Sequence, residues 1–221
     1  MLRALDICCK QGGATKGLQR VGFHVTGVDI EAQPNYCGGA FVRANALDLP
    51  FKFLRRFDFI WASPPCQAHT ALKVMANAGT HANLIPPMRA MLRDAERPYV
   101  IENVEGAPLC NPFMLCGTQF GLGIETHELR RHRIFESNIP ALAFPRRCKH
   151  RKTAIGIYGD HARAERIWRG KGSHFPDAEK VAIAGRAMDI DWMDWDGLTQ
   201  AIPPAYSEFI ARAWLKSRET P

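Results

Sequence analysis

The sequence has no long apolar run, no Cys-x-x-Cys pair and no low-complexity tract. Because Arg, Lys, Asp or His interrupts every apolar stretch before about 18 residues, we expect no membrane helix. Asp6 comes too early for the apolar centre of a secretory signal. The seven cysteines are an odd number, which favours free thiols in a reducing compartment over a disulfide framework. We therefore expect a soluble, cytoplasmic protein.

What the sequence does have is an ordinary globular composition and one strongly basic stretch. The 221 residues are 46% hydrophobic and 23% charged, which suits a chain with a large core and excludes a disordered or fibrous protein. The formal net charge is +7, yet residues 130–171 hold 12 basic and three acidic residues, whereas the remainder holds 17 basic and 19 acidic residues. A basic stretch on a nearly neutral body indicates a polyanion site, most simply for nucleic acid, with a solvated basic face as the alternative.

The pattern of apolar and glycine-rich segments predicts an α/β fold with a doubly wound, mostly parallel sheet. Strands are expected at 2–8, 22–30, 57–62 and 98–104, with another beginning at 131, and helices at 14–21, 81–96, 178–188 and 204–216. The first two strands flank Gly12-Gly13 and a helix, which makes a βαβ unit.

The chain is expected to have three regions. Residues 1–135 form the catalytic and cofactor-binding core, residues 136–177 a small, irregular, basic target-recognition region, and residues 178–221 a C-terminal segment that returns to the core. The middle region is too short to have a core of its own. Its small size predicts a short target sequence or loose specificity, because base contacts need room for side chains in the major groove.

Doubly wound sheets bind ligands at the carboxyl ends of their strands, where Asp29, Cys66 and Glu102 are expected. Asp29 ends the second strand, and a carboxylate there can accept both ribose hydroxyls of an adenosyl group. The glycine loop lacks both the G-x-G-x-x-G spacing and the phosphate-binding G-x-x-x-x-G-K-[ST] motif. A nucleoside-type cofactor is therefore favoured over a nicotinamide or ATP.

Three further groups of residues are candidates for chemistry. Pro64-Pro65 fix the backbone before Cys66, which is a way to hold a nucleophile, although a structural cysteine is the alternative. Glu102 stands among apolar residues, where desolvation favours a protonated acid that can donate to a ring nitrogen. Arg131 and Arg133 offer cations for a phosphate or a base carbonyl, with surface arginines as the alternative.

The order of these motifs resembles that of the DNA cytosine-5 methyltransferases, and the chain looks like a compact, phage-type member. The matching motifs are Asp6-x-x-x-x-x-Gly12-Gly13, Pro65-Cys66-Gln67, Glu102-Asn103-Val104, Arg131-x-Arg133 and Ala201-Ile202-Pro203-Pro204. The match covers about 1–135 and 178–215. It leaves the basic stretch in the place of the family's target recognition region.

The resemblance implies methyl transfer from S-adenosylmethionine to carbon 5 of a cytosine that is flipped out of DNA. Cys66 matches the thiolate that adds to carbon 6, and Glu102 matches the acid that holds N3 and the exocyclic amine. Arg133 would hold the base carbonyl, and Arg131 the backbone near the flipped nucleotide. Loss of the proton from carbon 5 after methyl transfer would release Cys66.

The resemblance also implies the binding residues. The expected cofactor contacts are Asp6, Cys8, Lys10, Gln11, Gly12, Gly13, Asp29, Ile30, Asn45, Ala46, Pro65, Gln200 and Ala201. The expected nucleic-acid contacts are Gln67, Asn103, Arg146, Arg147, Lys149, Arg151 and Lys152. The expected partner is double-stranded DNA. The chain is expected to act as a monomer that does not bind a membrane, and the sequence does not identify a partner nuclease.

Several positions depart from the family pattern. Cys8 stands where a Phe usually stacks on adenine, Lys10 replaces a Gly and Asn45 replaces an Asp. Leu129 replaces a Gln, and Thr199-Gln200 replaces Gly-Asn. Lys10 and Gln200 leave open a modified sulfonium cofactor with an extra anionic group, although a solvent-facing Lys10 explains the same residue.

Two other functions stay open. The same chemistry on RNA is one, because related tRNA cytosine methyltransferases share Pro-Cys-Gln and Glu-Asn-Val. A catalytically inactive DNA-binding protein is the other, although the intact Cys66, Glu102 and Arg133 argue against it.

Two other motifs are not expected to take part in the chemistry. Cys148-x-His150 offers two zinc ligands without a second pair, so the sequence predicts no metal site. Trp192, Met193 and Trp195 are expected to pack rather than to stack on bases.

Overall fold

The computed structural model describes residues 1–66, 82–139, 147–157 and 179–219. Its main sheet has seven strands in the order β3-β2-β1-β4-β5-β8-β6. These strands are β1 (Arg3–Ile7), β2 (His24–Asp29), β3 (Ala40–Arg43), β4 (Phe59–Ala62), β5 (Tyr99–Asn103), β6 (Phe113–Leu115) and β8 (Arg133–Ser137). The first five in chain order pair in parallel, and β8 and β6 are antiparallel additions. The predicted doubly wound, mostly parallel sheet is confirmed.

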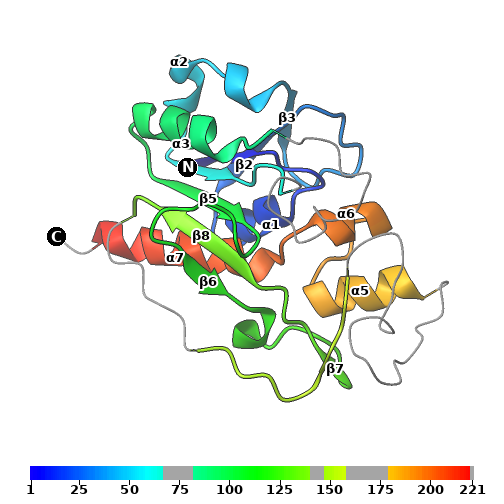
Figure 1. Cartoon of the computed structure of the whole chain (residues 1–221). Coiled ribbons are helices and arrows are strands. Elements are labelled where there is room, and N and C mark those ends of the chain that lie inside the picture. Colours follow the sequence, from blue (N-terminus) through cyan, green and yellow to red (C-terminus); the bar gives the residue numbers. More distant parts are fainter. Residues whose placement is uncertain (67–81, 140–146, 158–178, 220–221) are drawn as a thin grey trace.

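Helices cover both faces of this sheet (Figure 1). The longer ones are α1 (Gly13–Arg20), α3 (Ile85–Asp94), α5 (Lys180–Met188) and α7 (Pro204–Glu219). The shorter ones are α2 (Phe51–Leu54), α6 (Trp195–Gln200) and the 3-10 turns η1 (Ala46–Asp48) and η3 (Gly117–Phe120). A separate two-stranded ladder pairs β7 (His127–Glu128) with β9 (Thr153–Ala154) in parallel.

Side chains that alternate along β1 point into two hydrophobic cores, one on each face of the sheet. Ala4 packs into a core with residues of α1 and α7, whereas Leu5 and Ile7 pack into a second core with residues of α2 and α3. Strands that are buried on both faces read as continuous apolar runs, as these do. None of the described helices has the length and apolarity to span a bilayer.

Several predicted element boundaries differ from the observed ones by a few residues. The helix expected over 81–96 begins at Ile85, because Pro86-Pro87 occupy its first turn, where their missing N–H groups cost little. Strand β8 begins at Arg133, two residues after the expected start at 131, and continues to Ser137, because Glu136 and Ser137 still pair with β5. The last helix extends to Glu219 rather than ending near 216.

The C-terminal segment returns to the core through close contact between α1 and α7. A Cβ on Gly17 would collide with the main-chain oxygen of Pro204 and with Oγ of Ser207. The Ser207 hydroxyl donates to the main-chain oxygen of Ala14 at 2.8 Å. This contact holds the chain that precedes α7 beside the glycine loop.

Replacing Gly17 with alanine should therefore lower the free energy of unfolding by about 1–3 kcal/mol, because the added methyl group must push two packed helices apart. Urea denaturation measures the effect. Gly39→Ala is the matched control, since a Cβ there meets only the His24 ring at an ordinary 3.5 Å. Equal midpoints for the two variants would contradict this account of the helix contact.

Candidate active site

One cavity of about 610 Å³ lies at the carboxyl ends of the parallel strands. It is lined by Asp6 of β1, Asp29 of β2, Cys66 after β4 and Glu102 of β5. The strand register brings these ends together, because Ile7 pairs with Ala62 and Ala62 pairs with Ile101. The sequence placed Asp29, Cys66 and Glu102 at this edge from the predicted strands, whereas Asp6 was expected only from the family resemblance.

Most of the expected cofactor residues line this cavity. They are Asp6, Cys8, Lys10, Gln11, Gly13, Asp29, Ile30, Asn45, Ala46, Pro65, Gln200 and Ala201. Gly12 is not among the lining residues, but it has a positive φ of 91°, which shapes the turn into α1. A Cβ on Gly13 would collide with the main-chain oxygen of Ile202. The two glycines thus shape the loop and let the C-terminal segment close one wall of the cavity.

The glycine-loop side of the cavity contains two buried oxygens that lack a donor among the described residues, Asp6 Oδ1 and Gln11 Oε1. Asp6 is 1% exposed, and its other oxygen accepts hydrogen bonds from the Thr15 main-chain N–H (3.0 Å) and hydroxyl (2.6 Å). Burial raises the pKa of Asp6 to about 7. Such acceptors suit a ligand that brings a cationic N–H donor.

Asp29 is held in place at the end of β2. One of its carboxylate oxygens accepts from the Lys10 N–H at 3.0 Å and the other from the Glu31 N–H at 3.1 Å. Its carboxylate therefore has a fixed orientation at the cavity wall, as binding of a ribose diol requires.

The buried Asp6 carboxyl should make the ligand-free protein less stable as pH rises. Its pKa is about 7 in the folded protein against an ordinary 3.8, so the folded state holds the proton more tightly than the unfolded chain does. This contribution is present below about pH 4 and is lost as pH rises towards 7, with an upper limit of roughly 4 kcal/mol.

Urea unfolding at about pH 5 and about pH 7.5 measures the effect. Asp6→Asn should flatten the difference, and the exposed Asp191→Asn should leave it unchanged. The same pH dependence in Asp6→Asn would assign it to another group.

The other side of the cavity brings together a thiol, a carboxyl group and a guanidinium group. Arg133 Nε lies 3.1 Å from Glu102 Oε1. Burial raises the pKa of Glu102, while the Arg133 charge and a hydrogen bond from Ser63 act against it. This is the direction that its apolar neighbours predicted. Burial also raises the pKa of the half-buried Cys66, again opposed by Arg133. The group can supply a nucleophile, a proton donor and a cation.

Asn103, an expected nucleic-acid contact, lines the cavity with a side chain that is held by internal hydrogen bonds. It is 1% exposed, its amide donates to the main-chain oxygen of Pro64 at 2.9 Å, and its carbonyl oxygen accepts from the Val104 N–H at 3.0 Å. Because both ends of the side chain are used internally, Asn103 fixes the loop that carries Cys66.

Arg131 is also placed differently from the expectation. It does not line the cavity, and its guanidinium donates to the main-chain oxygens of Ile157 and Thr199, each at 2.7 Å. Burial, with the charge of Arg133, lowers its pKa to about 9. A guanidinium with these partners joins the start of β8 to α6 and to residue 157.

Lys10 and Gln200 line the cavity with their polar groups already paired. Lys10 Nζ lies 2.9 Å from Glu31 Oε2, and Gln200 Nε2 donates to Asp196 Oδ2 at 3.0 Å. These contacts do not favour the modified cofactor that the two residues left open.

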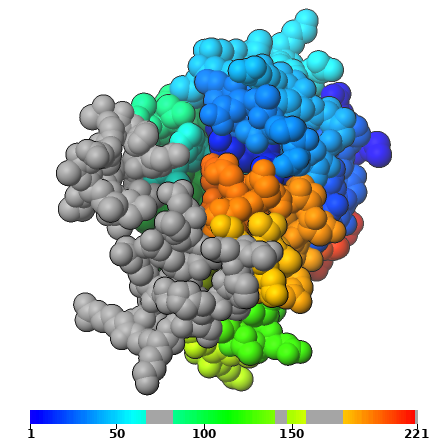
Figure 2. All heavy atoms as spheres, turned by 90° about the vertical axis from the view of Figure 1, so that its right-hand side faces the viewer, coloured from blue at the N-terminus to red at the C-terminus, as the bar shows by residue number. Residues whose placement is uncertain are grey.

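The sequence did not identify the residues that brace the glycine loop from far along the chain. Trp192 donates to the Gln11 main-chain oxygen at 2.8 Å, and Asp194 accepts from the Gln11 amide at 2.8 Å. Met193 is buried and lines the cavity, while Trp192 and Trp195 pack against the core as expected. Figure 2 shows the segment with α5 and α6 against the N-terminal residues.

Other lining residues were also missed, namely Cys9, Ala14, Glu31, Ser63, Pro64, Leu84, Val104, Thr199 and Ile202. Most of them neighbour a predicted residue in sequence, which was the only available signal.

The basic side chains that the structure describes in residues 147–152 are exposed. Arg147, Lys149, Arg151 and Lys152 all have exposed side chains, and the main-chain N–H groups of Arg151 and Lys152 donate to Glu128 Oε2 at 2.8 and 3.0 Å. Of the other expected nucleic-acid contacts, Gln67 and Arg146 lie outside the described residues.

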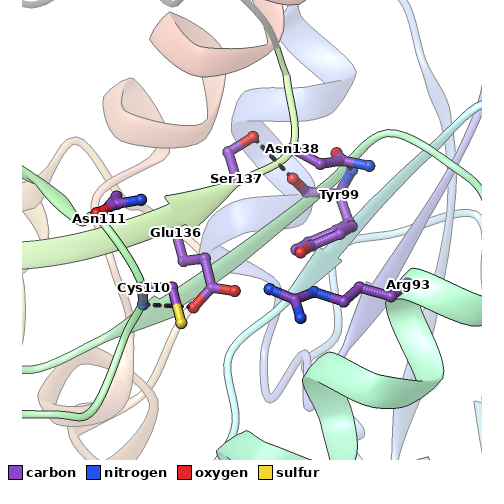
Figure 3. Close-up of a pocket in the computed structure, with 7 residues that line it drawn as sticks. All are labelled: Arg93, Tyr99, Cys110, Asn111, Glu136, Ser137 and Asn138. Carbon is purple, nitrogen blue, oxygen red and sulfur yellow. Dashed lines mark hydrogen bonds between the residues drawn. The ribbon is translucent and has the colours of Figure 1, made fainter.

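A smaller pocket of about 350 Å³ lies at the opposite edge of the sheet (Figure 3). Tyr99, which lines it, begins β5, whereas Glu102 lies near the end of that strand. Its Glu136 accepts from the Cys110 N–H at 2.8 Å and pairs with Arg89 at 2.7 Å. Because this carboxylate is already neutralised and none of the expected site residues is present, the larger cavity is the candidate active site.

No protein-family model and no curated protein sequence matches the chain. Among solved structures it is similar to a protein described as a DNA modification methyltransferase encoded within a prophage of E. coli, with 12% identity, a TM-score of 0.67 and coverage of 99% of this chain and 100% of that one. The S. pombe Dnmt2 methyltransferase has 12% identity, a TM-score of 0.63 and coverage of 99% of both chains. The Entamoeba histolytica methyltransferase EhMeth has 11% identity, a TM-score of 0.57 and the same coverage. The chain therefore has the Rossmann-like fold of S-adenosylmethionine-dependent methyltransferases.

Proposed function

We propose that the chain is a DNA cytosine-5 methyltransferase that uses S-adenosylmethionine. The observation that carries the proposal is one cavity in which Cys66, Glu102 and Arg133 face the same space as the glycine loop and Asp29. The fold supports methyl transfer in general. The order of the motifs supports cytosine as the substrate.

The residues of the cavity fit the cofactor. Asp29 would accept the ribose hydroxyls, and Asn45 with Ala46 would lie beside the adenine. The unpaired oxygens of Asp6 and Gln11 would accept from the cationic amino group of the methionine part. When bound, S-adenosylmethionine supplies the electrophilic methyl group.

The other side of the cavity would then activate the base. The Cys66 thiolate forms a bond to carbon 6 of a flipped cytosine, which makes carbon 5 nucleophilic. Glu102 donates its proton to N3 and so offsets the charge that develops on the ring, while Arg133 holds the base carbonyl. Once carbon 5 carries the methyl group, a base removes its proton, the S–C bond breaks to restore the Cys66 thiolate, and N3 returns its proton to Glu102.

The basic region would recognise DNA. We assign target recognition to residues 136–177, of which the described part presents Arg147, Lys149 and Arg151 to solvent. Exposed cations of this kind bind phosphates and position the protein, whereas base contacts set the sequence.

The experiment that tests the reaction supplies S-adenosylmethionine with an isotopically heavy methyl group to the purified protein with double-stranded DNA and, separately, with structured RNA. Mass spectrometry of the nucleosides should find heavy 5-methylcytosine in the DNA. If only the RNA carried heavy 5-methylcytosine, RNA would be the substrate and the proposed reaction at carbon 5 would stand. If neither nucleic acid carried label although the protein was folded and bound DNA, the proposal of an enzyme would be wrong. The chain would then be a catalytically inactive DNA-binding protein.

DNA affinity should depend on salt through the basic region. Replacing Arg147 and Lys149 together with alanine should weaken binding at all sequences and reduce the slope of log K against log salt by about 2, because each cation releases about one counterion. Fluorescence anisotropy at several salt concentrations measures the slope. Lys52→Ala with Arg56→Ala, two exposed cations on and beside α2, is the charge-matched control. If the two double variants had the same salt slope, DNA would not bind at Arg147 and Lys149.

A further inference from the structure

A second group of reactive side chains lies outside the cavity. Cys116, His132, Cys148 and His150 each place one sulfur or ring nitrogen so that the four atoms all lie within 4.8 Å of one another. They come from three parts of the chain: Cys116 immediately precedes the η3 turn, His132 precedes β8, and Cys148 and His150 belong to the basic region. The sequence left Cys148-x-His150 without a second pair, and the fold supplies one.

The distances suit a tetrahedral metal ion. Cys116 Sγ lies 3.4 Å from His150 Nε2, and Cys148 Sγ lies 3.8 Å from His132 Nε2. Ligand atoms at about 2.0–2.3 Å from a tetrahedral Zn²⁺ are separated from each other by about 3.3–3.8 Å. Two thiolates with two imidazoles are also a ligand set that zinc prefers.

Neighbouring groups orient two of the four ligands. His132 Nδ1 lies 3.1 Å from Glu105 Oε1, which leaves His132 Nε2 facing the cluster. A histidine that binds a metal usually donates its other ring N–H to such a carboxylate. The Thr118 hydroxyl lies 3.1 Å from Cys116 Sγ, where it can donate to a thiolate. Hydrophobic packing alone gives no reason for a carboxylate behind this histidine.

We propose that these four side chains bind a structural Zn²⁺ that fastens the basic region to the core. Four protein ligands complete the tetrahedron and leave no position for a substrate, so the ion would be structural. Cys116 is fully buried and His150 is exposed, so the ion would be bound between the core and the surface segment. Because His132 lies between Arg131 and Arg133, the ion would hold residues 147–152 beside the start of β8, close to the proposed base-binding residues.

Metal analysis of the full chain, purified under reducing conditions without a metal-affinity tag, tests the proposal. Mass spectrometry of the elements should find about one zinc per chain, and Cys148→Ser and His150→Ala should each lower this to below about 0.1. Cys110→Ser is the matched control, since this thiol is exposed and outside the cluster, and it should keep its zinc. Cobalt added to the metal-free protein should give the thiolate charge-transfer bands of a tetrahedral site.

Three results would overturn the proposal. They are a reduced wild-type protein that binds neither zinc nor cobalt, full zinc content in both ligand variants, and a Cys116–Cys148 disulfide as the stable form of the freshly purified protein. If Cys148→Ser fails to fold, His150→Ala still decides, because its side chain is exposed. A chelator should lower the melting temperature of wild type and Cys110→Ser but not that of His150→Ala.

Discussion

Replacing Cys66 with serine should abolish cytosine methylation while the protein stays folded. A serine hydroxyl loses its proton far less readily than a thiol, and burial already raises the pKa of Cys66 itself. The alkoxide needed to attack carbon 6 would therefore be almost absent. Methyl incorporation under saturating substrate should show kcat reduced by about 10³-fold or more.

Cys110→Ser is the control, because Cys110 is an exposed thiol that does not line the cavity. DNA that carries 5-fluorocytosine sharpens the test, since fluorine replaces the proton that must leave carbon 5 and the covalent complex persists. Wild type and Cys110→Ser should form this complex with cofactor present, and Cys66→Ser should not. Activity of Cys66→Ser within about tenfold of wild type would remove the thiol from the mechanism.

The placement of the cavity could be predicted because a parallel sheet converts chain order into position. Asp29, Cys66 and Glu102 each follow or end an apolar run, so the common edge of the sheet followed from the strands alone. The direction of the Glu102 pKa shift followed for a similar reason, because apolar neighbours on the strand already implied desolvation.

The partners of long side chains could not be predicted in the same way. Arg131 reaches main-chain oxygens 26 and 68 residues away, and Gln11 is held by residues more than 180 positions later. No periodicity or spacing in the sequence indicates either contact. The Cys116 and His132 pair was missed for the same reason, since only the antiparallel return of β8 beside β6 brings them together.

Glu102→Gln should reduce kcat by about 10²–10⁴-fold, because an amide can donate a hydrogen bond to N3 but cannot transfer a proton. Its neutral side chain is close in size, so cofactor affinity should be unchanged. The exposed Glu96→Gln is the control and should keep wild-type kinetics. Rates at saturating DNA and cofactor separate the effect on kcat from any effect on binding.

The pH profile tests the role of Glu102 more sharply than the rate does. The active form needs a protonated Glu102 and an ionised Cys66, and burial raises the pKa of both groups. Below the pKa of Glu102, the rate should rise with pH as the thiolate forms. Between the two pKa values, the loss of protonated acid offsets the gain of thiolate, so the rate of wild type should be flat.

Glu102→Gln should lack this plateau, because its rate depends on the thiolate alone and should continue to rise up to the raised pKa of Cys66. Measuring kcat across this range compares the two shapes directly. A plateau of the same position in both proteins would assign it to another group. Arg133 pairs with Glu102 and its charge also lowers the pKa of Cys66. Adding Arg133→Ala to the Glu102→Gln variant should therefore raise the pKa of Cys66, so that kcat continues to rise to a higher pH.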